Sequence, residues 1–199
     1  MRRVFIALLV SLFLSTGTEA IASDFANGFY VGGSGGIADN LSTCDEIGNP
    51  VSPSKCEDSD FGWQVFAGWQ ILKWISIEGG WTDLGQASSS DLTGGSAQSE
   101  TDGFQINAVA TAPILEKAGV YLKLGAYVWD LEVTQTDVLN VQTKVSDEGV
   151  DYVLGVGLRY PLTETLGLGF EFQRFEDIGS SKTGSFDSNL WTGGILMRF

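Results

Sequence analysis

Phe61-Gly62-Trp63-Gln64-Val65-Phe66-Ala67-Gly68-Trp69-Gln70 is the stretch of this sequence that decides the fold. Bulky apolar side chains occupy the odd positions and glycine or glutamine most of the even ones, which is the two-residue period of a β-strand. A tilted strand of about 9–11 residues is long enough to cross a bilayer. The stretch therefore predicts a strand with one face toward lipid and the other toward a polar interior.

The same alternation recurs along the chain. It predicts strands at 28–37, 61–70, 74–83, 103–112, 120–129, 151–160, 166–175 and 189–199. Short connections alternate with longer ones at 38–60, 84–102, 130–150 and 176–188. Short periplasmic turns and longer extracellular loops are typical of outer-membrane barrels. The pattern predicts an all-β fold, an eight-stranded antiparallel transmembrane β-barrel.

The two faces of the predicted strands separate a membrane barrel from a soluble one. Small and polar residues, such as Gly167, Gly169 and Glu171, oppose the bulky apolar set. An eight-stranded lumen is too narrow for the bulky set. A soluble lipocalin-like barrel, the alternative, would carry many charges on its outer face, where this chain is almost uncharged. We therefore expect the apolar face to meet lipid.

The N-terminal segment predicts export. A basic start, Met1-Arg2-Arg3, precedes an apolar run at 4–14, and Ala20-Ile21-Ala22 forms a small-x-small cleavage site. The run is too short for a transmembrane anchor, which needs roughly 20 apolar residues. We expect residues 1–22 to be a signal peptide and residues 23–199 to form one barrel domain in the outer membrane.

Charge limits the classes of partner. The net charge is −14, and the predicted leader takes away two arginines and one glutamate, which leaves the mature domain more negative still. This charge excludes nucleic acid as a partner, because no basic patch can form. It is compatible with divalent cations or basic partners at an exposed surface.

Cysteine and histidine content bears on chemistry. Cys44 and Cys56 in an exported protein predict a disulfide, which would close a small loop worth roughly 3 kcal/mol. The sequence contains no histidine, so we expect no metal site and no cofactor. Lipid A deacylases, phospholipases and omptin-type proteases rely on a histidine as general base. We therefore expect a protein that is not an enzyme.

Charged residues on the polar faces point to the inside of the barrel. Glu78, Lys123, Arg159 and Glu171 fall near the middle of predicted strands, and their charges balance. An unpaired buried charge costs several kcal/mol, so we expect an ion-pair network that plugs the lumen. The alternative is a gated channel in which these pairs break.

Aromatic residues are expected to mark the membrane interfaces, because amphipathic rings prefer headgroup depth. Trp69, Trp74 and Tyr160 sit beside short turns, and Tyr30, Trp81 and Trp129 lie nearer the long connections or mid-strand.

The C-terminal strand carries a pattern of its own. A terminal Phe199, with Met197, Ile195 and Trp191 on the same face, resembles the barrel-assembly signal of outer-membrane proteins. Thr192, Gly194, Met197 and Phe199 supply its polar, glycine and hydrophobic positions. An open final strand can pair with the edge of the assembly machinery before the barrel closes.

Four segments carry a further resemblance: FYVGG at 29–33, GWQVFAGW at 62–69, EGGWTDLG at 78–85 and EFQRF at 171–175. They resemble the outer-membrane protein A (OmpA)-like transmembrane β-barrel family over nearly the whole mature chain. The resemblance implies eight strands around a polar, charge-paired interior. Larger relatives append a peptidoglycan-binding domain, and because this chain stops at Phe199 we expect no such tether.

Two functions remain from the sequence. The first is a structural or surface-interaction role, in membrane integrity, adhesion or surface protection, through acidic extracellular loops. The alternative is a small pore or transporter for ions or small solutes. The expected partners are outer-membrane lipid and lipopolysaccharide, the barrel-assembly machinery, and an extracellular host or surface ligand.

Overall fold

A closed β-barrel is the whole of the described fold. The computed structural model describes residues 28–41, 55–90, 96–114, 117–137, 139, 141–180 and 183–199. Its strands are β1 (Phe29–Leu41), β2 (Lys55–Glu57), β3 (Ser59–Leu72), β4 (Ile75–Ser90), β5 (Ser96–Pro113), β6 (Gly119–Thr136), β7 (Gln142–Pro161), β8 (Leu166–Ser180) and β9 (Gly184–Arg198). Within these residues, no helix is long and apolar enough to span a bilayer.

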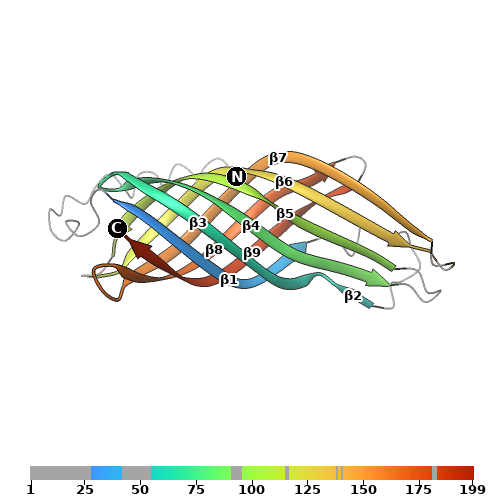
Figure 1. Ribbon diagram of the computed structural model, residues 1–199, viewed down its shortest axis with the longest axis horizontal. Helices are drawn as coiled ribbons and strands as arrows, with labels where there is room; N and C mark the ends of the chain where they lie inside the picture. The colour runs from blue at the N-terminus through green and yellow to red at the C-terminus, as the bar shows by residue number, and fades with distance from the viewer. Residues whose placement is uncertain are drawn as a thin grey trace, which may run out of the picture.

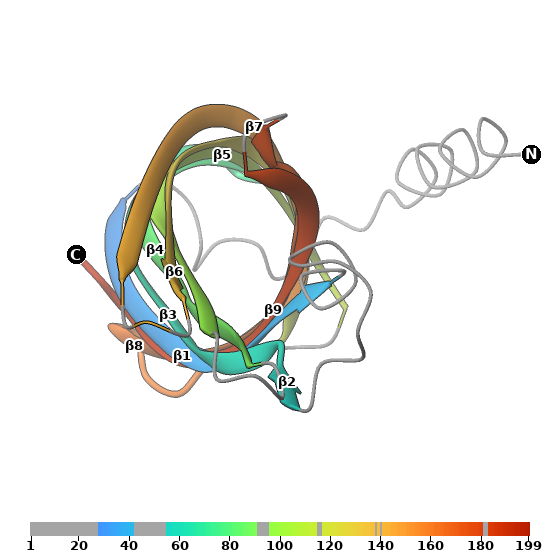
Figure 2. The ribbon, with the colours of Figure 1, turned by 90° about the vertical axis from the view of Figure 1, so that its right-hand side faces the viewer.

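The sheet closes because its first and last long strands meet. All neighbouring strands are antiparallel, β1 pairs with β9, and β4 pairs with β5. Viewed end-on in Figure 2, the strands form a ring. The short β2 ends two residues before β3 begins and pairs with the end of β4, beyond the part of β4 that pairs with β3. The predicted eight-stranded antiparallel barrel is confirmed.

The strand boundaries differ from the prediction at one end of the barrel. β6 has 18 residues and β7 has 20, about twice what a bilayer crossing needs. The strands continue through most of three segments that were predicted as loops, 84–102, 130–150 and 176–188. In Figure 1, β4 to β7 extend toward the right. These segments are polar and lack a lipid-facing stripe, but backbone pairing in a hairpin does not require one.

Two predictions fall on parts of the chain that the structure does not describe. The signal peptide at 1–22 and Cys44 lie outside the described residues, and of Cys56 only the backbone, in β2, is described. The disulfide between Cys44 and Cys56 therefore stays a prediction.

The polarity of the two barrel faces inverts along the strands, and β6 shows this most clearly. From Val120 to Val128 its outward side chains are apolar and its inward ones include Lys123 and Tyr127. From Asp130 onward the outward side chains are polar, whereas Leu131 and Val133 point inward and are buried. We call the first part the membrane section and the second the outer section. The outer section has the polarity of a soluble barrel.

An apolar cluster begins in the lumen at the end of the membrane section and continues through the outer section. Its members are Ala38, Leu84, Tyr127, Trp129, Leu131, Val133, Val153, Phe175, Ile178, Phe186 and Leu190. The Tyr127 and Phe175 rings meet edge to face, with centroids 4.8 Å apart. A packed core of this kind lets hairpins stand in water without lipid around them.

The aromatic residues predicted at the membrane interfaces divide by the direction of their side chains, and for those that point outward the interface depth stays a prediction. Outside the barrel, Trp69, Trp74 and Tyr160 are exposed beside the short turns, and Trp81 is exposed on β4. For Tyr30 and Trp129 the interface placement was wrong, since both point inward and are only 2% and 3% exposed. Buried hydrogen bonds explain the difference, because each polar group has a partner inside the barrel.

Glycines opposite the inward aromatic rings explain part of the high glycine content. Gly68 and Gly157 pair across the sheet with Tyr30 and Tyr121. A Cβ at Gly157 would stand 2.4 Å from the Tyr121 ring, and one at Gly68 would stand 2.1 Å from the Tyr30 ring. Each tyrosine therefore lies flat over a neighbouring strand that has no side chain there.

Candidate functional site

The predicted interior charges come together in one cluster. Glu78, Lys123, Arg159 and Glu171 project inward from β4, β6, β7 and β8, and all are buried. The Lys123 Nζ lies 3.0 Å from Glu78 Oε2 and 2.7 Å from Glu171 Oε1. Arg159 pairs with Glu78. We call these residues the charge network; its charges sum to zero.

Two tyrosines that the sequence analysis did not place here complete the charge network. Tyr30 donates a hydrogen bond to Glu78 Oε1 at 2.6 Å, and Tyr121 donates one to Glu171 Oε2 at 2.7 Å. The Arg159 guanidinium lies 5.1 Å from the Tyr30 ring centroid and 4.4 Å from that of Tyr121. Such contacts favour a desolvated cation. The signal available in the sequence was that Tyr30 and Tyr121 alternate with outward apolar residues.

An amide layer lies beside the charge network. Gln105 and Gln173 both donate to Gln64 Oε1 at 3.0 Å, and Asn107 donates to Gln105 Oε1 at 2.9 Å. These amides lie on the polar faces that the alternation predicted. Together with the apolar cluster they fill the interior from one section to the next.

The charged side chains of the site are paired with one another. Each charged group of the charge network has an oppositely charged partner, so none is an exposed acid or base. Within the described part of the chain, no group of three or more acidic or cysteine side chains is arranged to hold a metal ion.

A row of acidic side chains marks the boundary between the two sections. Asp83, Asp102, Asp130 and Glu148 stand opposite one another on β4, β5, β6 and β7. We call this row the acidic rim. Partial burial, then the charges of Asp83 and Asp130, raise the pKa of the Asp102 carboxyl above its ordinary value. Directly opposed like charges destabilise a sheet.

Asp102→Asn should therefore stabilise the barrel at neutral pH by about 0.5 kcal/mol at low salt. A raised folded-state pKa means that ionised Asp102 weakens the folded state, and that this penalty disappears as pH falls through that pKa. Urea unfolding at two pH values and two salt concentrations measures the gain, with the exposed turn variant Glu164→Gln as control. A gain that persists at acidic pH or in high salt would contradict an electrostatic origin.

The residues of the predicted assembly signal divide between the two faces of β9. Thr192 and Gly194 point into the lumen, whereas Met197 lies on the outer face and Phe199 is exposed at the end of the chain. The Phe199 amide donates to the Phe29 carbonyl at 3.0 Å, which ties the last residue to the first strand.

The closed eight-stranded barrel with this interior can be compared with known proteins. Residues 24–199 match the OmpA-like transmembrane domain. The chain belongs to this family. Outer membrane protein A of Salmonella typhi is 27% identical over 202 residues, which cover 100% of this chain and 56% of that protein. The Escherichia coli O157:H7 protein is 26% identical, with 100% and 55% covered. The chain thus spans about half the length of these curated relatives.

Solved structures show the same fold at low identity. Neisserial surface protein A superposes with a TM-score of 0.61 at 16% identity, covering 86% of this chain and 97% of that one. Ail of Yersinia pestis, in complex with the heparin analogue sucrose octasulfate, gives 0.53 at 12% identity, covering 87% and 97%. Family membership and this fold place the protein in the outer membrane.

Proposed function

We propose that this OmpA-family barrel is a closed scaffold that displays its outer section at the cell surface, in a structural or surface-interaction role. The inversion of polarity carries the proposal. A protein that only filled the membrane would have no need of strands twice the bilayer length with an apolar core of their own. Outside the apolar cluster, the outer section presents acidic and polar side chains, which favour water over lipid.

The interior supports a closed barrel over the alternative of a small pore or transporter. A charge network and an apolar cluster lie in series along the lumen, and ions crossing it would have to displace both. Non-enzymatic function belongs to the same proposal, since the sequence has no histidine and the interior charges are paired.

Different parts of the barrel surface favour different partners. Lipid and the acyl chains of lipopolysaccharide surround the apolar outer face, and the C-terminal strand engages the assembly machinery. For a ligand outside the cell, the acidic rim favours a basic surface. Sucrose octasulfate, bound in the Ail structure, is a polyanion, which an acidic rim would repel. The proposed ligand class therefore differs from that one.

Conductance of the refolded mature protein in planar bilayers distinguishes display from transport. A closed scaffold should give no unitary conductance steps at moderate voltage. A porin-type barrel refolded in the same way serves as positive control for insertion. Reproducible steps whose size depends on salt would contradict the closed scaffold and favour the pore.

A further inference from the structure

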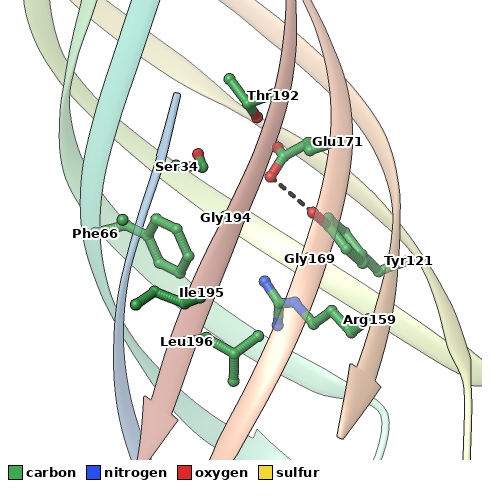
Figure 3. A pocket seen from close by; sticks show the side chains of 11 residues that line it. Ser34, Phe66, Tyr121, Arg159, Gly169, Glu171, Thr192, Gly194, Ile195 and Leu196 are labelled. Atoms are coloured by element: carbon green, nitrogen blue, oxygen red, sulfur yellow. Dashed lines mark hydrogen bonds between the residues drawn. The ribbon is translucent and has the colours of Figure 1, made fainter. Parts of the chain in front are cut away.

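A small cavity lies inside the membrane section beside the charge network. Its volume is about 20 Å³, and its lining includes Ser34, Tyr121, Arg159, Glu171 and Thr192. Figure 3 shows Ser34, Thr192 and Glu171 gathered at one end of it, with the Arg159 guanidinium toward the other. The cavity borders the seam where the first and last strands of the barrel meet.

Two hydroxyl groups at this cavity have no partner among the residues that the structure describes. Ser34 Oγ and Thr192 Oγ1 are both buried and make no hydrogen bond there. Thr192 stands directly opposite Glu171 across β8 and β9, and Ser34 stands opposite Gly194 across β1 and β9. Buried hydroxyls are almost always satisfied by protein or by ordered water.

Glycine makes the space. Gly169 lies between Arg159 and Gly194 in the sheet, on the inward side. A Cβ at Gly169 would have only the Leu158 carbonyl oxygen within 4 Å, at 3.9 Å. The floor of the cavity is therefore open where a larger side chain would have filled it.

The charged residues of the lining already have oppositely charged partners, so the cavity favours a neutral ligand. Glu171 already has Lys123 at 2.7 Å, and Arg159 adds a positive charge to the wall, so a further cation is disfavoured. Glu171 Oε2 accepts one hydrogen bond from Tyr121 and retains accepting capacity. A cavity of about 10–15 Å³ or more with two or more polar partners is sufficient for one water molecule.

We propose that this cavity binds one structural water molecule, held by Ser34, Thr192 and Glu171. The water donates one hydrogen to the Glu171 carboxylate and one to a hydroxyl oxygen, and it accepts from the second hydroxyl. It thereby links β1, β9 and β8 across the closing seam. Thr192 and Gly194, the polar and glycine positions of the C-terminal pattern, then have a role in the folded barrel.

Oxygen-17 relaxation dispersion in detergent micelles counts long-lived internal waters and tests the site. Gly169→Ala, whose methyl group would occupy the cavity, should lower the count by one relative to the unmodified protein. Gly193→Ala is the matched control, because it lies on the outer face with nothing within 4 Å of the added Cβ. Equal counts for Gly169→Ala and the unmodified protein would overturn the proposal.

Thr192→Val gives an independent test through the sign of its effect. If the hydroxyl holds a water, its removal should lower the urea midpoint, by roughly 0.5 M. If the cavity is dry, removing an unsatisfied hydroxyl should raise the midpoint, and a rise would overturn the proposal. Should Thr192→Val fail to fold, Ser34→Ala carries the same comparison with the same two outcomes.

Discussion

Lys123→Met is expected to lower the free energy of unfolding of the barrel by about 3–5 kcal/mol, the loss typical of breaking a buried ion pair from one side. The effect is large because Lys123 bridges two buried carboxylates, at 3.0 Å from Glu78 and 2.7 Å from Glu171. Glu78 keeps Arg159 as a partner in the variant. Among the described residues, Glu171 has no other cation within ion-pair distance, so its carboxylate is left uncompensated.

The double variants distinguish a shared network from independent pairs. Lys123→Met with Glu171→Gln should recover most of the loss, because the neutral amide needs no counter-charge. Lys123→Met with Glu78→Gln should recover less, because Arg159 then loses its partner. Urea unfolding in lipid vesicles is measured for the unmodified protein, for the single variants Lys123→Met, Glu171→Gln and Glu78→Gln, and for the two double variants. Additive losses of about 1 kcal/mol or less would place these residues outside a shared buried network.

Leu131→Ala should lower the free energy of unfolding by about 2–5 kcal/mol, as for a leucine removed from a packed core. Leu131 is 0% exposed and belongs to the apolar cluster, yet it lies on β6 beyond the lipid-facing part of that strand. Its loss leaves a cavity in the outer section without changing any lipid contact.

The same hairpin offers a matched control. Leu139 lies in the connection between β6 and β7 and is 78% exposed, so Leu139→Ala should change stability by no more than about 0.5 kcal/mol. Unfolding in vesicles with both variants gives the contrast directly. If the two substitutions had equal, small effects, the outer section would not contain a packed core and would not stand as a rigid extension.

The sequence predicts the membrane section well because lipid imposes a strict rule. Outward residues there are mostly apolar and inward ones mostly small or polar, so the alternation in 61–70 is visible without a structure. No such rule holds above the membrane. The segment 130–136 has polar residues outside and Leu131 and Val133 inside, and its threonine and acidic residues resemble those of loops.

β-Bulges are a second reason why the alternation of residues in the sequence does not predict the strands of the outer section. Gly85, at φ 70°, and Asp177, at φ 60°, adopt left-handed conformations where the strand registers shift. Leu84 and Ala87 both point inward although they are three residues apart, because the bulge between them adds one residue. A period of two cannot be followed through such a point.

The interior site could be predicted in part. The four charged residues of the network lie on the polar faces of their strands. Because the lumen is narrow and closed, their side chains can find oppositely charged partners only among one another. Tyr30 was not predicted, because its amphipathic ring is suited equally to a membrane interface and to a buried carboxylate. Only the position of Gly68 on the neighbouring strand, known from the register, shows where its ring has room.

A nitroxide scan along the outward positions of β6 tests most directly whether the same strand faces lipid in one section and water in the next. Labels placed singly at 122, 124, 128, 130, 132 and 134 in vesicles are probed with oxygen, which favours lipid, and with a water-soluble nickel complex. We expect oxygen to dominate through 128 and nickel to dominate from 130 onward. Oxygen dominance out to 134, or nickel access at 124, would contradict the division into a membrane section and an outer section.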